Sequence, residues 1–224
     1  MHYFTIVRHG QTPVNVINHV QSRTGGELTP LGVNMAKSLG RYLKNEIFTR
    51  ILSSDLHRCR LTTENIISQM TVETPPVEYT KILRERDYGD WEFLPGQVTQ
   101  DKRIEMNLPK EKDFQVDVPN GESYQDCLLR AGRLFSGICK IVDESSESID
   151  ENILAVSHGT FINTFVDYLM SSPLLEIKNE TTGPIPPMLN TCRTRLAISK
   201  SGDQKRTVTI THLFNADHLK DCAA

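Results

Sequence analysis

The sequence contains no uninterrupted apolar run of about 18 residues, the length that a membrane-spanning helix requires. Its first residues, Met1 to Thr5, lack the basic region and the apolar stretch of a secretory signal peptide. We therefore expect neither a transmembrane helix nor export, and we predict a cytoplasmic protein.

Neither sign of charge dominates, because 25 Lys and Arg residues are matched by 28 Asp and Glu residues, giving a formal net charge of -3. A chain so nearly balanced has no electrostatic reason to bind nucleic acid or an acidic membrane surface. We expect neither partner, and the sequence leaves open whether the protein is a monomer or a homodimer.

Cysteine is scarce and shows no pairing pattern: there are five residues, an odd number, and no CxxC spacing. Without an export signal, free thiols in a reducing compartment are expected. No group of ligands has the short spacing of a zinc site, so no metal is expected either. The cysteines are Cys59, Cys127, Cys139, Cys192 and Cys222.

Strand-like and helix-like segments alternate along most of the chain. The 224 residues are enough for one proper core, and we predict a single domain over residues 1–224. The alternation predicts a three-layer α/β/α sandwich with a mostly parallel central sheet. Strands are expected at 3–7, 51–53, 153–156, 194–199 and 207–214, with residues 200–203 between the last two; helices are expected from residue 30 with Thr29 as N-cap, over 55–69 with Ser54 as cap, over 123–142, and around 161–169.

The middle of the chain interrupts this alternation. Residues 71–119 are rich in proline and in charged side chains and show no regular apolar period. We predict that residues 71–122 form an insertion or lid, with some helix around 98–107.

Three of the predicted strands end in polar residues. The first is followed by Arg8-His9-Gly10, the second by residues 53–58, and the third by Ser157-His158-Gly159. In open α/β sheets, ligands bind beyond the carboxyl ends of the strands. If the strands are parallel, these groups can therefore converge on one pocket.

Such a pocket would contain two histidines and two arginines. Guanidinium groups, here Arg8 and Arg58, are permanently charged and match the oxygens of a phosphate. Nearby cations disfavour imidazolium, so a histidine among arginines is more readily neutral and nucleophilic. The glycine after each histidine allows backbone N–H groups to approach an anion. The implied reaction is phosphoryl transfer to a histidine followed by hydrolysis, with arginine rather than magnesium stabilising the charge.

The leaving oxygen of such a reaction needs a proton. The segment from Leu83 to Glu92 offers several carboxylates, and spacing alone does not choose among them. A general acid would need a raised pKa, which burial beside the phosphate can supply.

The motifs in this chain resemble those of the histidine phosphatase superfamily, whose fold is that of the phosphoglycerate mutases. Arg8 to Asn15 is similar to its RHGxTxxN signature, and five further segments follow in the same order. These are Leu28-Thr29-Pro30-Leu31-Gly32, Ser53 to Arg58, Leu83-Arg84-Glu85 with Tyr88-Gly89, Gly121-Glu122-Ser123, and Ser157-His158-Gly159. An ordered set of this length is far more specific than the first tripeptide alone.

The resemblance implies a role for each matching residue. His9 would be the nucleophile that becomes phosphohistidine, and Glu85 would protonate the leaving oxygen. The phosphoryl oxygens would be held by Arg8, Arg58, His158 and Asn15, with help from the Gly159 N–H. Gln21 and Tyr88 would line the side where the rest of the substrate lies. The family uses no metal, and no cofactor is expected.

Within the superfamily, the chain looks most like the TIGAR-type fructose-2,6-bisphosphatases. Residues 83–89, Leu189-Asn190-Thr191 and Asp217-His218-Leu219 carry this likeness. The pattern is broken at Leu61-Thr62-Thr63, where members of the family often have Gln-Thr-Ala, and at Phe93, where glycine is usual. These positions flank the predicted pocket and bear on substrate choice. The resemblance implies a phosphatase for small phosphate esters, such as the sugar phosphate fructose 2,6-bisphosphate, or one of broad specificity.

Three other hypotheses remain. A phosphoglycerate mutase-type phosphotransferase would use the same residues but pass the phosphoryl group to a second substrate. A catalytically dead phosphate-binding or scaffold protein would bind the anion without turnover, although the intact residue set argues against this. A redox sensor is weaker still, because Cys59 alone lies within a motif and is expected to pack as a small apolar residue.

Overall fold

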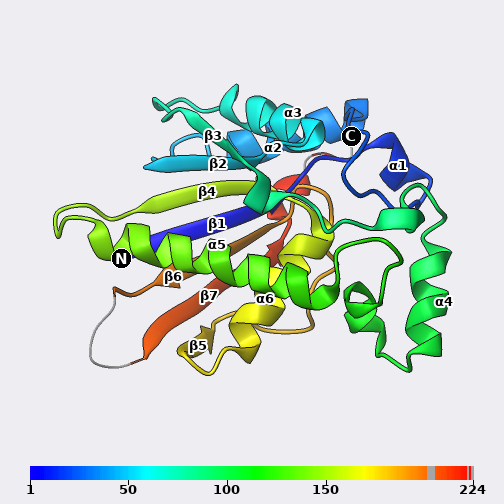
Figure 1. The fold of residues 1–224 in the computed structure, drawn as a ribbon. Helices are drawn as coiled ribbons and strands as arrows, with labels where there is room; N and C mark the ends of the chain where they lie inside the picture. The colour runs from blue at the N-terminus through cyan, green and yellow to red at the C-terminus, as the bar shows by residue number, and fades with distance from the viewer. Residues whose placement is uncertain (201–204, 221, 223–224) are drawn as a thin grey trace.

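A computed structural model describes residues 1–200, 205–220 and 222, and its centre is a seven-stranded sheet in the order β3-β2-β4-β1-β6-β7-β5. Helices cover both faces of the sheet (Figure 1). The predicted three-layer α/β/α architecture is confirmed. The strands are β1 (His2–Arg8), β2 (Arg50–Ser54), β3 (Val77–Thr80), β4 (Asn152–Ser157), β5 (Leu175–Asn179), β6 (Arg193–Ile198) and β7 (Arg206–Asn215). The α-helices are α1 (Pro13–Val16), α2 (Pro30–Tyr42), α3 (His57–Ile67), α4 (Gln97–Glu105), α5 (Tyr124–Glu144) and α6 (Gly159–Ser171); the 3₁₀ helices are η1 (Lys81–Leu83), η2 (Gly89–Trp91), η3 (Lys110–Gln115) and η4 (Asp217–Leu219).

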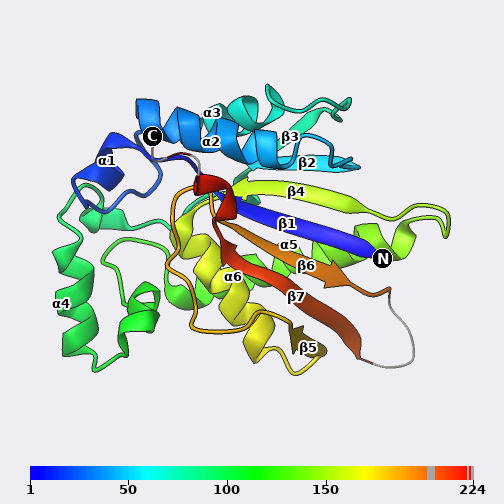
Figure 2. The ribbon, with the colours of Figure 1, turned by 180° about the vertical axis from the view of Figure 1, so that it is seen from behind.

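The sheet is parallel except around one strand. β1 pairs in parallel with β4, β4 with β2, β2 with β3, and β5 with β7, whereas β6 runs antiparallel to both of its neighbours. In Figure 2, the gold connection from β5 to β6 runs to the end of the sheet where the red C-terminal segment also lies. A hydrogen bond of 2.9 Å between Thr191 Oγ1 and His218 Nε2 joins these two segments.

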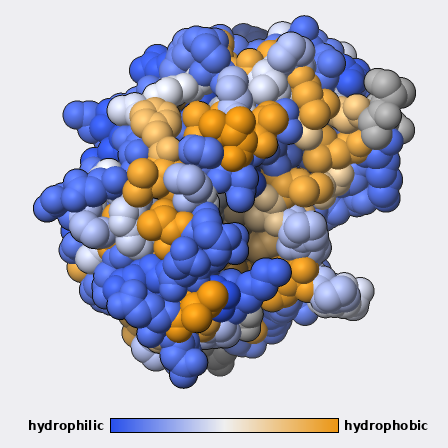
Figure 3. All heavy atoms as spheres, turned by 90° about the vertical axis from the view of Figure 1, so that its right-hand side faces the viewer, coloured by the Kyte–Doolittle hydropathy of each residue, from blue (hydrophilic) through white to orange (hydrophobic). Residues whose placement is uncertain are grey.

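The carboxyl ends of β1, β2 and β4 lie at one edge of the sheet because these three strands are mutually parallel neighbours. Arg8 is in register with Ser157, and Ser53 is in register with Val156. Figure 3 faces this side of the molecule and shows a hollow whose wall includes apolar residues. The edge is therefore where the three predicted motifs come together.

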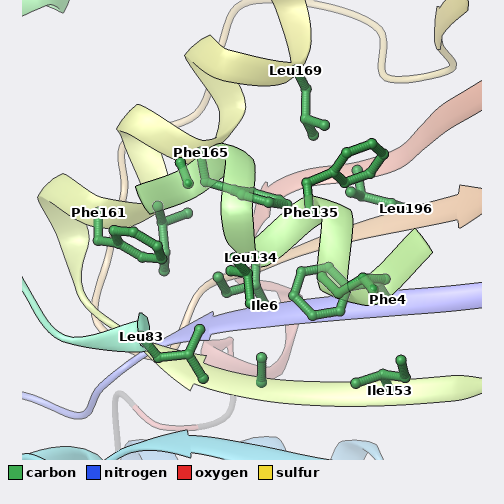
Figure 4. Close-up of a cluster of buried hydrophobic side chains, with 14 of the residues drawn as sticks. Phe4, Ile6, Leu83, Leu134, Phe135, Ile153, Phe161, Phe165, Leu169 and Leu196 are labelled. Carbon is green, nitrogen blue, oxygen red and sulfur yellow. The ribbon is translucent and has the colours of Figure 1, made fainter. Parts of the chain in front are cut away.

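The core has two parts, one on each face of the sheet. Ile153 and Ala155 of β4 pack with α5 and α6, whereas Leu154 and Val156 pack with α2 and α3. Figure 4 shows the first cluster, in which Phe161 and Phe165 of α6 point toward β1 and β4. Burial on both faces explains why β4 has no polar alternation, as the sequence predicted.

α2 begins as predicted and supports the loop after β1. Thr29 is its N-cap, accepting a 2.9 Å hydrogen bond from Gly32 N, and Pro30 occupies the first helical position. A Cβ on Gly32 would lie 2.2 Å from the carbonyl oxygen of Gln11, so only glycine lets the loop approach the helix so closely. This contact places the residues that follow β1 against a rigid element.

Residues 71–122 add the edge strand β3 to the sheet and continue into η1, η2, α4 and η3. A small apolar cluster joins this segment to Val20 through Tyr88, Trp91 and Val116. The guanidinium of Arg86, fully buried, donates to the carbonyls of Glu122 at 2.7 Å, Phe114 at 2.7 Å and Val116 at 2.9 Å. That this region acts as a lid remains a prediction.

Three local predictions differ from the structure. Residues 71–119 include the parallel edge strand β3, and Leu175–Asn179 form the edge strand β5, neither of which was predicted. α3 begins at His57 with Leu56 as an N-cap that makes no side-chain bond, so Ser54 is not its cap.

Helix at 97–105 agrees with the prediction for 98–107. Of the predicted connection at 200–203, residues 201–203 lie outside the described residues. No helix in the described part of the chain is long and apolar enough to cross a bilayer.

Candidate active site

The three strand ends bring two histidines next to each other. His9 follows β1 and His158 follows β4, and the centroids of their rings are 5.3 Å apart. Arg8 is the last residue of β1, and Arg58 lies in the first turn of α3, which follows β2. The structure thus brings together the histidines and arginines that the sequence predicted for one pocket.

His9 is oriented by its own neighbour. Its Nδ1 lies 2.8 Å from the carbonyl oxygen of Gly10, and because a carbonyl only accepts, Nδ1 carries the proton and Nε2 has the free lone pair. The side chain is buried, and burial together with the charges of Arg58 and Arg8 lowers the pKa of His9 well below its usual 6.5. His9 therefore offers a neutral, nucleophilic Nε2.

The loop that carries His9 is held by two residues that sequence reasoning did not assign to the site. Thr62 accepts a 2.9 Å bond from Gly10 N while its own hydroxyl donates to the Arg58 carbonyl at 2.6 Å. Asn190 donates to the carbonyl of His9 at 3.0 Å. The sequence signal for Thr62 was its place within Leu61-Thr62-Thr63, and the signal for Asn190 was the likeness around Leu189-Asn190-Thr191.

Arg58 is fully buried and makes three hydrogen bonds. Its Nε donates to His158 Nδ1 at 3.1 Å, its NH2 group to the carbonyl of Ser22 at 2.6 Å, and its NH1 group to the carbonyl of Thr24 at 3.3 Å. These bonds fix the plane of the guanidinium, and the N–H groups beyond these three bonds are the ones that can bind an anion.

His158 is the partner of Arg58 on the other strand. Because Nδ1 accepts from Arg58, the proton lies on Nε2, which donates to Ser54 Oγ at 2.9 Å. Burial and the charge of Arg58 lower the pKa of His158 well below 6.5. The hydroxyl of Ser54 thus accepts from His158 in the site instead of capping α3.

The sulfur of Cys59 lies 3.3 Å from His158 Nε2. Burial raises the pKa of this thiol to about 12, so it stays protonated at neutral pH. A protonated, fully buried thiol reacts slowly with oxidants, which fits the expected packing role better than a redox sensor.

Three buried donors in this region, on Arg8, Gln21 and Arg23, have no hydrogen-bond partner within the described chain. Arg8 donates from its NH1 group to the carbonyl of Met188 at 2.6 Å, but its Nε is unpartnered. Gln21 accepts from the Thr12 hydroxyl at 2.8 Å, but its Nε2 is unpartnered. Buried donors of this kind are costly unless an acceptor binds them, and an oxyanion is such an acceptor.

The remaining predicted phosphate ligands lie close by. The side-chain Oδ1 of Asn15 accepts from Thr12 N and from Asn190, each at 3.1 Å. These two bonds fix the orientation of the amide, so its Nδ2 group is the donor that can bind a phosphate oxygen. Gly159 begins α6 beside Arg8, since a Cβ at Gly159 would lie 3.3 Å from Arg8 Nε. Glycine at this position leaves room for that guanidinium.

Glu85 lies against the first turn of α6. Its Oε1 accepts from Arg86 N and Phe161 N, each at 2.9 Å, and its Oε2 accepts from Thr160 N at 3.2 Å. Burial raises the pKa of Glu85 above its usual 4.5, although these N–H groups and Arg58 act against the shift. A carboxyl group with a raised pKa, next to the loop of His158, has the property that a general acid needs.

Tyr88 is buried and lies against the same turn of α6. Its hydroxyl shares a 2.9 Å hydrogen bond with Thr160 Oγ1, and burial raises the pKa of the phenol. The predicted contact of Tyr88 with substrate remains a prediction.

Within residues 1–200, 205–220 and 222, no group of three or more His, Cys, Asp or Glu side chains could hold a metal ion.

Comparison with known proteins agrees with this geometry. Residues 4–211 match the model of the histidine phosphatase superfamily (branch 1). The chain is 24% identical, over an alignment of 265 positions, to fructose-2,6-bisphosphatase TIGAR of Xenopus tropicalis, covering 98% of this chain and 95% of that protein. It is 33% identical over 167 positions to a broad-specificity phosphatase of Saccharomyces cerevisiae, covering 73% of this chain and 68% of that protein. The fold matches that of a phosphoglycerate mutase from Bacillus anthracis, with a TM-score of 0.74, 22% identity, and coverage of 100% of this chain and 97% of that one.

Proposed function

Because the chain belongs to branch 1 of the histidine phosphatase superfamily, a family of enzymes acting on phosphate esters, we propose that it is a metal-independent phosphatase that works through phosphohistidine on His9. One observation carries the proposal. The unprotonated Nε2 of His9 lies in a pocket with buried N–H donors of Arg8 and Gln21 that have no hydrogen-bond partner and can bind the oxygens of a phosphate.

In the first step, the lone pair of His9 Nε2 attacks phosphorus and the bond from phosphorus to the ester oxygen breaks. The proton on Glu85 moves to that oxygen, so the alcohol leaves neutral and Glu85 becomes a carboxylate. Arg8, Arg58 and Asn15 donate to the equatorial oxygens and stabilise their charge, with the Gly159 N–H beside them. His158, the other predicted ligand, accepts from Arg58 Nε and orients that guanidinium.

In the second step, Glu85 accepts a proton from water while the water oxygen attacks phosphorus of phosphohistidine. The P–N bond breaks, and its electron pair returns to His9 Nε2. Inorganic phosphate leaves, and His9 and Glu85 return to their starting protonation states.

The test is direct trapping of the intermediate. Wild-type protein, quenched with base or denaturant within milliseconds of mixing with a ³²P-labelled ester and EDTA, should carry label that is stable to alkali and released by acid. His9→Ala should carry none and should lose turnover. His212→Ala, which alters a histidine of β7 outside the motifs, is the matched control and should behave as wild type. Full activity of His9→Ala would overturn the proposal.

For the substrate, we propose a sugar phosphate such as fructose 2,6-bisphosphate, in line with the likeness to TIGAR. Arg23 supports a second phosphate. It lies two residues after Gln21, its Nε is buried without a partner in the described chain, and its guanidinium is held only at 3.4 Å by Asp87 and 3.7 Å by Glu122. Arg23→Gln should raise KM for fructose 2,6-bisphosphate about tenfold while leaving a monophosphate within about twofold. Equal changes for both would remove the bisphosphate from consideration and leave a broad-specificity phosphatase.

The alternative is a phosphotransferase of the mutase type. It would keep every step up to phosphohistidine and replace water with a monophosphate acceptor. Interconversion of 3- and 2-phosphoglycerate, measured beside release of inorganic phosphate, separates the two functions. Interconversion faster than phosphate release would favour the mutase.

A further inference from the structure

Phe93 is held in a backbone conformation that its side chain disfavours. Its φ is +66°, in the left-handed region where a Cβ crowds the following carbonyl group. Among the described residues other than glycine and asparagine, Thr191 and Phe214 share this feature, and both are buried. Packing explains why Thr191 and Phe214 keep this backbone conformation. The Phe93 side chain, by contrast, is 49% exposed, so burial does not account for its strain.

Backbone hydrogen bonds fix the segment that carries this exposed ring. Phe93 N donates to the carbonyl of Val20 at 2.8 Å, and Val20 N donates to the carbonyl of Leu94 at 2.8 Å. The segment that carries Phe93 is therefore paired with the segment that carries Gln21.

The ring lies near the unpartnered amide of Gln21. A Cβ at Gly25 would lie 3.4 Å from Gln21 Nε2 and 3.9 Å from Cε1 and Cζ of Phe93, so the amide and the ring edge border the same space. Gly25 contributes no side chain to this space. A phosphate bound by Gln21 would thus have the Phe93 ring beside it.

The second unpartnered donor has an apolar neighbour as well. A Cβ at Gly159 would lie 3.3 Å from Arg8 Nε and 3.7 Å from the sulfur of Met188. Apolar groups consequently flank both donors, and apolar surface borders the hollow on this side of the molecule (Figure 3). A group esterified to a phosphate held by these donors would meet apolar surface close to the phosphate.

We propose that Phe93 is a specificity-determining residue whose ring contacts the group esterified to the phosphate. The contact favours esters whose leaving group carries a ring with an apolar face, such as a sugar ring or an aryl ring, over short acyclic alcohols such as glycerate. This inference rests on the proposed phosphatase function and names the substrate class for the same site.

The experiment compares kcat/KM for phenyl phosphate and fructose 2,6-bisphosphate with kcat/KM for glycerol 2-phosphate and 3-phosphoglycerate. Phe93→Gly suits the left-handed backbone, and Phe93→Asn tolerates it while removing the ring, so both variants should fold, with Tm equal to or above that of wild type. Both should lose about tenfold in kcat/KM for the ring-bearing esters, mainly through KM, and less than about twofold for the acyclic esters.

Ile149→Ala is the matched control. Ile149 is 48% exposed and lies in the loop between α5 and β4, at the opposite end of the sheet from the site. It should leave all four values unchanged. Equal losses for ring-bearing and acyclic esters, or no loss at all, would overturn the role of Phe93 while the phosphatase function stands. Absence of turnover and of phosphoenzyme in the wild type would instead overturn the function itself.

Discussion

Arg58 donates its Nε–H to Nδ1 of His158 across 3.1 Å, and this one bond sets the protonation pattern of the second histidine. With Nδ1 acting as the acceptor, Nε2 must carry the proton that it donates to Ser54. His9 shows the opposite tautomer, because its Nδ1 donates to a carbonyl and its Nε2 is free. The two imidazoles thus differ in role, one as nucleophile and one as donor.

The first prediction concerns Arg58→Lys. Lysine keeps the charge but cannot donate at once to His158, Ser22 and Thr24, so kcat/KM should fall by about 10²- to 10³-fold. Nitrogen-15 NMR of the imidazoles should show that His158 loses its fixed Nε2–H tautomer. Arg60→Lys is the control on the same helix, where the guanidinium lies 3.9 Å from the centroid of the Tyr79 ring. A wild-type tautomer in Arg58→Lys would contradict the argument.

The second prediction tests Glu85 as the proton donor. Glu85→Gln should lower kcat/KM by about 10²-fold or more for alkyl phosphates, whose leaving oxygen needs a proton. The loss should be much smaller for p-nitrophenyl phosphate, because p-nitrophenolate leaves without one. Glu64→Gln, an exposed position on α3, should have no such dependence. Equal losses with both leaving groups would remove Glu85 from this role.

The third prediction is the pH dependence of kcat/KM. His9 must be neutral, and its pKa is lowered, so the acid limb should lie below pH 6.5. Glu85 must be protonated, and its pKa is raised, so the basic limb should lie above pH 4.5. The profile should be bell-shaped. When both proteins are assayed with the same ester, the ionisation of the ester affects both profiles equally, and Glu85→Gln should lose the basic limb. A basic limb that is unchanged in Glu85→Gln would assign it to another group.

Stability should also depend on pH, with a defined sign. The pKa values of His9 and His158 are lowered in the folded protein, so the unfolded chain binds more protons below pH 6.5. The contribution of these two histidines to the free energy of unfolding should be at its full value above pH 6.5 and fall as the pH drops, by up to about 1.4 kcal/mol per pH unit for each histidine. Urea unfolding from pH 7.5 to 5 measures this slope. His158→Asn should reduce it, whereas His57→Gln, at an exposed position, should not.

The parts of the molecule that the sequence predicted are those with strong local signals. β4 is an unbroken apolar run, and α2 has both Thr29 and Pro30 at its start. β3 and β5 are four- and five-residue edge strands, and neither has a buried residue. Their pairing depends on neighbours distant in the sequence, so no local pattern predicted them.

The same distinction applies to the site. The motifs predicted that His9, Arg8, Arg58 and His158 lie together, because each ends or follows a strand, or lies in the first turn of a helix, at the carboxyl edge. The position of Ser54 before a helix predicted a cap, but its hydroxyl accepts a hydrogen bond from His158, 104 residues away. The carbonyls of Ser22 and Thr24 that hold Arg58 are backbone groups, and no side-chain pattern predicts their use.

The last prediction concerns Glu92, which supports Arg58 from behind. Its Oε1 accepts from Ser22 N at 3.2 Å, from Thr24 N at 2.8 Å and from the Thr24 hydroxyl at 2.7 Å. The carbonyls of the same two residues accept from Arg58, so Glu92 acts as a positioning residue for that guanidinium.

Because one oxygen makes all of these bonds, Glu92→Gln retains an acceptor and should keep kcat/KM within about threefold of wild type. Glu92→Ala leaves the segment unsupported and should lower kcat/KM about 10²-fold, since small displacements of a catalytic group have effects of this size. The inhibition constant of orthophosphate should rise in parallel, because the guanidinium binds the anion. Glu105→Ala on α4 is the control, and a loss in Glu92→Gln as large as in Glu92→Ala would show that charge, not position, is what Glu92 supplies.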